Sequence, residues 1–296
     1  MNQSIPDFLI NVLQDPEGGG PLAYDPNANK MVSDTGNSYD VKKGIPILLK
    51  PSDTHHAEND FDYARHYEKD AEVFHYEEVN EHPVSAFENR RLHEMILMNL
   101  PKDPCMILDI GCGNGWVAAS CLPKGHHVIS ADIGRINPMK AVTKYPSEKH
   151  AGLVADAFSL PLKNGSVDII IAAEIMEHVV NPKVFMAELY RCLRPGGKMI
   201  ITTPYHEKLE YSLCIHCHQA TPRHAHLHSF HEKNIPPMIP EGSRFELVIF
   251  MNKFLLKLYT HVVLKYFPFV FWKKIDQFAN VLRPSALRMM VVVEKK

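Results

Sequence analysis

The stretch ILDIGCGNGW, residues 107–116, decides the fold. It starts as a short apolar strand and continues into Asp109, Gly111, Gly113 and Gly115, spaced D-x-G-x-G-x-G. Glycine at alternate positions lets the backbone come close to a ligand, and it leaves peptide N–H groups aimed at an anion with a helix N-terminus behind them. The sequence therefore predicts a strand, a tight loop and a helix that together hold a negatively charged group.

Acidic residues end the next two predicted strands. A dinucleotide-binding turn would need a third glycine where Trp116 stands, and tryptophan is too large for close contact between helix and strand. Asp132 ends the second strand, where a carboxylate can accept hydrogen bonds from both hydroxyls of a ribose, and Asp156 ends the third. The pattern favours a nucleoside-containing ligand and weakens a dehydrogenase interpretation.

The rest of the chain from Cys105 onward alternates between short apolar runs and helical segments. The strand-like runs read CMILDIG, HVISADI, AGLVADA, VDIIIAAE and KMIITTP. Nearly continuous apolar runs are typical of strands that are buried on both faces. The alternation predicts an α/β fold, a parallel sheet with helices on both of its faces.

Together these motifs resemble the class I S-adenosylmethionine-dependent methyltransferases, and within them the small-molecule methylases related to quinone-biosynthesis enzymes. The resemblance runs from about Cys105 to Pro204 and includes VADAFSLPLKNGSVDIIIAAEIMEHV and ELYRCLRPGGKMIITTP. It implies a Rossmann-like, doubly wound sheet of seven strands. It also implies that the last strand, ALRMMVVVE, is antiparallel.

The resemblance assigns roles to residues at the strand ends. It implies that Asp109 and the glycine loop hold the methionine end of S-adenosylmethionine, that Asp132 binds the ribose and that Asp156 meets the adenine. Glu174 would lie beside the methyl-transfer position. The implied cofactor-binding set is Asp109, Gly111, Cys112, Gly113, Gly115, Asp132, Ile133, Asp156, Ala157 and Glu174.

The sequence singles out no catalytic residue. The methyl group of the cofactor sits on a positively charged sulfur, so alignment of a nucleophile and exclusion of water carry most of the catalysis. Glu177 and His178 could supply a base, but they fit equally well as a helix start that organises the loop after the fourth strand. Other candidate bases are Tyr67, Tyr76, Tyr205 and His206.

Residues 214–230, CIHCHQATPRHAHLHSF, concentrate metal-binding side chains. The C-x-x-C pair Cys214 and Cys217 lets two thiolates face one tetrahedral ion, and His224 and His226 would complete a Cys2His2 zinc shell. Similar methyltransferases carry such a pair before an H-x-x-S-F turn, which HLHSF matches with His226 in first place. A redox pair and metal-free surface thiols are the alternatives. Four protein ligands leave no open position, so we expect a structural zinc that shapes a wall of the substrate pocket.

Three regions organise the chain. Residues 1–50 resemble the zinc-ribbon-like module that activates some RNA and protein methyltransferases, without its cysteines, and we expect a structural or interaction module. We expect residues 51–100 to form a helical lid. We expect residues 101–296 to form the methyltransferase domain, with insertions at 205–235 and 253–285. The four expected knuckle positions of the first region hold Asp15, Gly18, Val32 and Thr35.

Composition limits the function classes. The formal net charge of -2 argues against a nucleic-acid partner. No targeting signal is visible, so we expect a cytoplasmic protein whose cysteines are thiols or metal ligands. The most apolar run, 254–272, is interrupted by lysines and Pro268, which argues against a membrane span.

The late insertion has two interpretations. Lys253, Lys257, His261 and Lys265 recur every four residues on an otherwise apolar stretch. A cap helix packed over the sheet edge is one interpretation. The other is a lid that admits a lipid-like or aromatic substrate, with the basic residues in contact with a membrane surface.

The predicted function is methyl transfer from S-adenosylmethionine to a small-molecule acceptor by in-line displacement. The alternative is a cofactor-binding subunit that depends on a protein partner, which residues 1–50 would contact, or that has no activity of its own. Intact Asp109, Asp132 and Asp156 favour the enzyme, because a scaffold would not need them.

Overall fold

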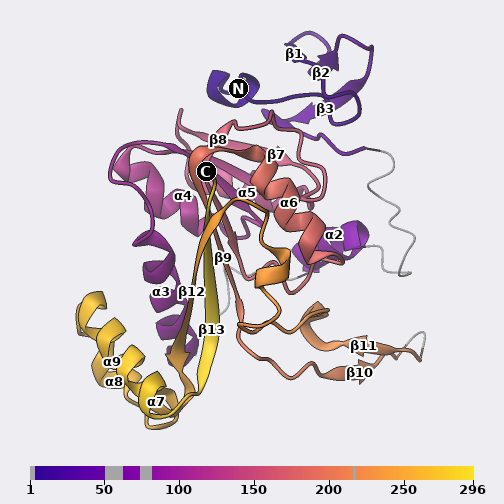
Figure 1. Ribbon diagram of the computed structural model, residues 1–296. Helices are drawn as coiled ribbons and strands as arrows, with labels where there is room; N and C mark the ends of the chain where they lie inside the picture. Colours follow the sequence, from indigo (N-terminus) through magenta and orange to yellow (C-terminus); the bar gives the residue numbers. More distant parts are fainter. Residues whose placement is uncertain (1–3, 51–62, 74–81, 216–217) are drawn as a thin grey trace.

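The computed structural model describes residues 4–50, 63–73, 82–215 and 218–296, and its centre is a seven-stranded sheet. The strand order is β12-β13-β9-β8-β5-β6-β7. The strands are β5 (Met106–Ile110), β6 (His127–Asp132), β7 (His150–Val154), β8 (Val167–Ala173), β9 (Leu193–Pro204), β12 (Arg244–Asn252) and β13 (Ala286–Glu294). The α/β fold with a doubly wound sheet is confirmed (Figure 1).

The direction of each strand follows the expectation. β5 pairs in parallel with both β6 and β8, and β8 pairs in parallel with β9. β13 pairs antiparallel with β9 on one side and with β12 on the other. The prediction that ALRMMVVVE is antiparallel is therefore correct. The carboxyl ends of the parallel strands all meet at one edge, where ligands bind in open α/β sheets.

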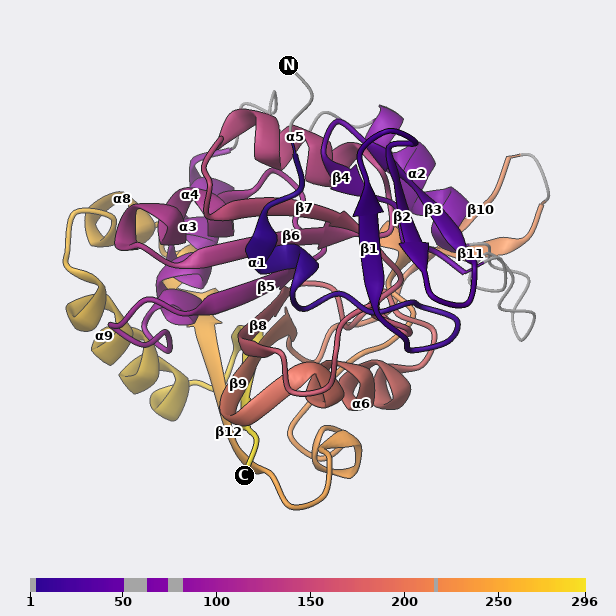
Figure 2. The same ribbon diagram turned by 90° about the horizontal axis from the view of Figure 1, so that it is seen from above.

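Helices cover the sheet on both faces (Figures 1 and 2). One apolar core joins the sheet to α3, α4 and α9, and the other joins it to the N-terminal region and α6. The helices are α1 (Asp7–Ile10), α2 (Tyr63–Val73), α3 (Pro83–Leu97), α4 (Trp116–Cys121), α5 (Ile136–Lys144), α6 (Pro182–Cys192), α7 (Lys253–Lys257), α8 (His261–Leu264) and α9 (Phe269–Leu282), with single 3-10 turns η2 (Leu122–Lys124), η3 (Arg223–Ala225) and η4 (Pro236–Met238).

The late insertion is not one helix with one basic face. It breaks into α7, α8 and α9, with Tyr259 in the left-handed region at φ 56° between the first two. His261 is buried, whereas Lys253, Lys257 and Lys265 are exposed. The expected stripe of four basic residues is therefore wrong for His261, because the break in the helix turns this side chain inward.

Residues 4–50 form a small antiparallel sheet that is joined to the main one. Its strands are β1 (Leu22–Asp25), β2 (Lys30–Ser33), β3 (Ser38–Lys42) and β4 (Ile45–Pro46). Just after β4, Ile47 forms a parallel bridge with Val154 of β7, and the Leu48 amide donates to the Val154 carbonyl at 2.9 Å. The module thus covers the outer edge of β7, which would otherwise expose unpaired backbone groups.

A buried carboxylate lies where the first expected metal knuckle falls. Asp15 is 1% exposed and accepts hydrogen bonds from the Tyr39 hydroxyl at 2.6 Å, the Asn37 amide at 3.0 Å and the Thr35 hydroxyl at 3.2 Å. Burial alone would raise the pKa of Asp15, but these bonds and the Glu17 amide bring it down to about 2. The Asp15 carboxylate therefore connects to Thr35 by a hydrogen bond. Both residues stand at positions where the zinc-ribbon-like family has metal ligands.

Asp15 is expected to make the fold sensitive to acid. Its pKa is lower in the folded chain than in an unfolded one, so its contribution is fully present above about pH 4 and is lost as the pH falls toward 2. A shift of this size corresponds to about 2.5 kcal/mol. We expect Asp15→Asn to lower the free energy of unfolding by about that amount at pH 7. Below pH 4, the free energy of unfolding should decrease less steeply with falling pH in the variant than in the wild type. Denaturant titrations at both pH values measure this, and Asp25→Asn in an exposed turn is the control.

Candidate functional site

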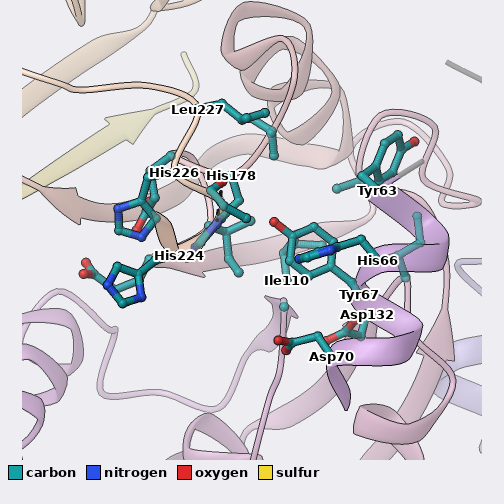
Figure 3. A pocket seen from close by; sticks show the side chains of 18 of the residues that line it. Tyr63, His66, Tyr67, Asp70, Ile110, Asp132, His178, His224, His226 and Leu227 are labelled. Carbon is teal, nitrogen blue, oxygen red and sulfur yellow. Dashed lines mark hydrogen bonds between the residues drawn. The ribbon is translucent and has the colours of Figure 1, made fainter. Parts of the chain in front are cut away.

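A large cavity opens at the carboxyl edge of the parallel strands. Its volume is about 1520 Å³, more than a single drug-sized ligand needs. The loops after β5, β6, β7 and β8 line one part of it. Figure 3 shows Tyr63, His66, Tyr67 and Asp70 of α2 on one side, facing His178, His224 and His226 on the other.

The glycine loop after β5 forms the floor of this cavity. Gly111, Gly113 and Gly115 all have positive φ values, of 68°, 46° and 75°. A Cβ on Gly111 would lie 2.2 Å from the Ile175 side chain, whereas one on Gly113 would meet nothing closer than 4.0 Å. Gly113 thus faces open space in the cavity, as a backbone that approaches a ligand must. Gly115 starts α4 and packs on Ala141, away from the cavity.

Asp132 and Asp156 lie at neighbouring strand ends and both line the cavity. The Asp132 carboxylate accepts from the Gly134 amide at 2.9 Å and from the Asn137 side chain at 3.0 Å, one bond to each oxygen. Asp156 accepts from the Phe158 amide at 2.9 Å, and its other oxygen accepts from the Tyr63 hydroxyl of α2. Each carboxylate is held in place by these bonds, and carboxylate oxygens can accept more than one hydrogen bond each.

Asp109 lies beneath the loop and is not among the residues that line the cavity. It is 2% exposed, and one of its oxygens has no hydrogen-bond partner among the described residues. Burial, with the nearby Asp132 charge, raises the pKa of Asp109 to about 8. Its expected contact with the methionine end of the cofactor stays a prediction. A positively charged group above the loop would favour the ionised form of this carboxyl.

The remaining residues of the implied cofactor set line the cavity. Cys112 and Ile133 follow Gly111 and Asp132, and Ala157 follows Asp156. Glu174 stands at the end of β8 with φ at 56°, an uncommon conformation for a residue other than glycine. Its carboxylate pairs with Arg288 at 2.9 Å, and its Oε1 atom has no hydrogen-bond partner in the described part of the chain. The Arg288 pair fixes one oxygen of Glu174, and its expected place beside the methyl-transfer position stays a prediction.

Helix α2, within the predicted lid, contacts the loops after β6 and β7, whereas α3 of the same range packs in the core against the sheet. Glu68 accepts from the Arg135 amide at 2.7 Å, and Tyr63 donates to Asp156. Tyr67 stands edge-on to His178, with ring centroids 6.0 Å apart, so α2 reaches both halves of the cavity. Other residues of the predicted lid, 51–62 and 74–81, lie outside the described residues.

Three potential metal ligands converge in the same cavity. Atoms of Glu177, His178 and His226 all lie within 4.8 Å of one another. His178 Nδ1 donates to the Ala225 carbonyl at 3.3 Å, and His226 Nδ1 donates to the Glu207 carboxylate at 2.6 Å. A carbonyl and a carboxylate oxygen accept, so a neutral imidazole at either position would have its lone pair on Nε2. Metal-binding histidines are typically held in this way by an acceptor on their second nitrogen.

The electrostatics of this group suit a cation. Burial lowers the pKa of His178 to about 4, so its imidazole is neutral at pH 7. Burial, and then the nearby Glu174, raise the pKa of Glu177 well above its usual range. Glu177 is 1% exposed and accepts from the Thr203 hydroxyl at 3.1 Å. A divalent cation would offset the cost of ionising this buried carboxyl.

Backbone hydrogen bonds hold the loop that contains His226 beside Glu177. The Leu227 amide donates to the Glu177 carbonyl at 2.8 Å, and the His228 amide donates to the same oxygen at 3.3 Å. The sequence did not assign Glu177 and His178 to a metal. The available signal was E-x-x-E-H, residues 174–178, immediately after the fourth parallel strand.

Two of the predicted Cys2His2 ligands, Cys214 and His224, lie at different ends of a hairpin. Strands β10 (Tyr211–Leu213) and β11 (Ala220–Pro222) pair antiparallel, and the Cys214 amide donates to the Gln219 carbonyl near the tip. His224 follows the other end of the hairpin, where Pro222 pairs with Tyr211. Three residues of strand span roughly 10 Å, which separates Cys214 from His224. Cys217 lies outside the described residues, so the four-ligand zinc site stays a prediction.

The candidate bases are unequally placed. Tyr67 lines the cavity, whereas Tyr205 and His206 are not among the lining residues. A hydrogen bond that Tyr205 donates to Glu232 at 2.7 Å, and burial after it, raise the pKa of this phenol to about 12. Tyr205 is therefore a poor base at neutral pH. Tyr76 lies outside the described residues.

Comparison with known proteins agrees with this geometry. A family model described as a methyltransferase domain matches residues 108–201, about a third of the chain. A Mycolicibacterium smegmatis protein named "Probable S-adenosylmethionine-dependent methyltransferase" is 30% identical over 38% of this chain and 44% of its own length. The ubiquinone biosynthesis O-methyltransferase of Maricaulis maris is 31% identical over 39% of this chain and 46% of its own.

The solved structures support the fold. An S-adenosylmethionine-dependent methyltransferase from Mesorhizobium loti superposes with a TM-score of 0.50 at 16% identity, covering 72% of this chain and 100% of its own. The present chain spans less than half the length of the two curated relatives that it matches. The matched segment holds the glycine loop, Asp132, Asp156 and the E-x-x-E-H motif. The chain therefore contains a segment, residues 108–201, that matches a methyltransferase domain and is similar in sequence to S-adenosylmethionine-dependent methyltransferases.

Proposed function

We propose that this protein transfers the methyl group of S-adenosylmethionine to a small-molecule acceptor by in-line displacement. The observation that carries the proposal is that one cavity contains both the glycine loop with Asp132 and the cluster of Glu177, His178 and His226. The first part suits a nucleoside cofactor. The second lies where an acceptor would stand, on the far side of Glu174.

The chain's own residues would act by positioning and by excluding water. Asp132 and Asp156 hold the nucleoside end of the cofactor, while α2 and the β10–β11 hairpin wall the cavity. Alignment of two reacting groups can supply about 7 to 11 kcal/mol of barrier reduction. Tyr67 and His178, which touch each other across the cavity, would limit how the acceptor enters.

The proposal includes a divalent metal ion on Glu177, His178 and His226. Imidazole and carboxylate donors together suit zinc, iron, cobalt or manganese better than the all-oxygen sites of calcium. Such an ion would supply Lewis-acid chemistry that lowers the pKa of an acceptor hydroxyl. Because three protein ligands leave coordination positions open, this centre differs from the closed, structural zinc of the Cys2His2 prediction.

The acceptor atom is proposed to be a hydroxyl oxygen on a lipid-like or aromatic molecule. One of the matched relatives is named an O-methyltransferase of ubiquinone biosynthesis. Apolar side chains of the lining, Ile175, Val179 and Val180, lie next to the cluster in the chain and would contact such a molecule. Glu177, His178 and His226 would hold the ion near the acceptor, and the chemistry that it would supply is to favour ionisation of a hydroxyl nucleophile.

Two measurements test the proposal in sequence. Calorimetry with S-adenosylmethionine should show binding of one molecule per chain. A metabolite extract incubated with the protein, methyl-labelled cofactor and manganese or zinc should then yield a labelled small molecule. No cofactor binding would refute the proposal. Binding without any labelled product would instead favour the alternative, a cofactor-binding subunit that depends on a partner, for which residues 1–50 are the candidate contact.

A further inference from the structure

Exposed apolar side chains gather on the insertion between β12 and β13. Among the described residues, 18 large apolar side chains are exposed, and 11 of them lie between residues 258 and 282. We call these 11 the α7–α9 apolar face, and the ribbon of α8 and α9 lies near α3 at one side of the molecule (Figures 1 and 2). Its members are Leu258, Tyr259, Val262, Val263, Tyr266, Phe267, Val270, Phe271, Phe278, Val281 and Leu282. Contiguous exposed apolar surface of this kind marks an interaction site.

The insertion is already anchored to the body of the protein on its inner side. Trp272 is 1% exposed and packs edge-on to Phe87 of α3, with ring centroids 6.3 Å apart. Arg91, fully buried, donates to the Leu264 carbonyl at 2.6 Å and to the Phe267 carbonyl at 3.0 Å. The apolar face is therefore the outer surface of a docked element.

The insertion buries several polar side chains and exposes many apolar ones, which is unusual for helices at a protein surface. The buried side of α9 carries Asp276 and Asn280, and α8 buries His261. Asp276 accepts from the Met251 and Asn252 amides at 2.9 and 2.7 Å. A helix that only covers a sheet edge would place polar groups outward. Here three polar side chains face inward while 11 large apolar side chains are exposed, so the exposed apolar side chains fit a second contact.

All exposed charges of the insertion are positive. Residues 253–283 contain six Lys and Arg and one acid, Asp276, which is buried, so the segment's formal charge is +5. The whole chain has a formal charge of -2, which leaves -7 for the remainder. The cations Lys253, Lys257, Lys265, Lys274 and Arg283 are exposed around the apolar side chains. The occupant of this face should thus be apolar with anionic groups at its rim.

A bilayer surface with anionic headgroups has this chemistry. Aromatic and aliphatic side chains would enter the boundary between headgroups and acyl chains, and the lysines would reach the headgroups along their flexible stems. A symmetric dimer would instead place the same patch against itself and oppose like charges, with no exposed acid in the segment to compensate. No helix in the described ranges is long and apolar enough to cross a membrane, so the contact would be peripheral.

The insertion leaves and rejoins the sheet at the edge that holds the cavity. Asn252, which ends β12, pairs with Ala286, which starts β13. Arg288, two residues further on, pairs in register with Pro204 at the end of β9, and both line the cavity. A surface bound by the α7–α9 apolar face would therefore lie at the same end of the sheet as the cavity.

We propose that the α7–α9 apolar face docks this protein on anionic membrane surfaces. The test is flotation of the full-length protein with vesicles of phosphatidylcholine alone or mixed with phosphatidylglycerol. We expect flotation with the mixed vesicles. The double variant Val281→Ser, Leu282→Ser should lower the partition coefficient at least tenfold, since each removes an exposed apolar side chain. Lys257→Gln and Lys265→Gln should each lower it about fivefold, and only with the anionic vesicles.

The matched control is Leu213→Ser, Ile215→Ser, which removes two equally exposed apolar side chains from the β10–β11 hairpin. This control should float like the wild type. All these residues are exposed, so thermal melting should confirm that every variant is folded. Absence of flotation with both vesicles, or equal loss in the control, would overturn the proposal. So would a dimer in light scattering that Val281→Ser, Leu282→Ser dissociates, because the face would then bind a second copy.

Discussion

Replacing Asp132 with alanine is expected to weaken binding of S-adenosylmethionine by roughly 100-fold or more. The Asp132 carboxylate ends β6 and is oriented by Gly134 and Asn137, so both oxygens keep lone pairs toward the cavity. Hydrogen bonds to a charged group contribute about 1.5 to 3 kcal/mol each, and a ribose diol would lose two. Calorimetric titration with S-adenosylmethionine measures the change.

The pH dependence of the same binding gives a second readout. Burial raises the pKa of Asp132, although the bonds from Asn137 and Gly134 oppose the shift. The carboxyl therefore takes up a proton at a higher pH than a free aspartate would. Because the protonated form loses acceptor capacity, cofactor affinity should fall as the pH decreases from neutral, and this fall should disappear in Asp132→Ala.

Asp168→Asn is the matched control for this substitution. Asp168 also belongs to the sheet, but it lies at the opposite edge, where it accepts from the Met106 amide at 2.6 Å and pairs with Arg194. The control should lower thermal stability and leave cofactor affinity unchanged. If Asp132→Ala binds the cofactor as tightly as the wild type, the ribose assignment is wrong.

Replacing Glu177 with glutamine is expected to lower the rate of methyl transfer about 100-fold or more while the cofactor still binds. The amide keeps the shape of the side chain and its contact with Thr203 but removes the charge that a divalent cation needs. Removal of a Lewis acid or base from a transfer reaction costs about 100- to 10,000-fold. Treatment with a chelator should have the same effect, and the rate of the chelated wild type should recover when metal is returned.

Separate variants distinguish the proposed metal cluster from the predicted Cys2His2 site, both of which would use His226. Cys214→Ser affects only the predicted Cys2His2 site, and His178→Ala affects only the cluster with Glu177. Metal content measured by mass spectrometry should fall in His178→Ala and stay unchanged in Cys214→Ser. The opposite result would support the structural zinc.

Hydrogen exchange should also show that metal removal loosens residues 206–232. Full activity in a verified metal-free sample would contradict both versions.

Much of the cofactor side of the site could be predicted from the sequence. The D-x-G-x-G-x-G spacing and the acids at successive strand ends are local patterns, and parallel pairing brings their strand ends to one edge. The position of Gly115 was less predictable, because only its contact with Ala141 shows that it packs against α5. Asp109 likewise lies below the cavity, where its pKa is set by burial that the sequence does not reveal.

The metal side depends on contacts that a local sequence pattern does not contain. The C-x-x-C spacing of Cys214 and Cys217 suggested a self-contained site, yet the hairpin turns Cys214 toward its tip and His226 toward Glu177. The histidines of residues 224–228 are chemically alike in sequence. Which of these histidines lies beside Glu177 and His178 depends on two backbone hydrogen bonds to the Glu177 carbonyl. These bonds join segments that are far apart in the chain.

The sequence by itself predicted the α/β class and the glycine loop after β5, because each depends on periodicity or spacing within a few neighbouring residues. The antiparallel last strand followed from the family resemblance alone. Only the tertiary structure decided which ligands meet His226, which way His261 points and how the insertion places its polar side chains. Those outcomes depend on how whole segments pack, and packing energies arise between residues that the sequence places far apart. The apolar residues of the insertion were visible in the sequence, but their exposure was not.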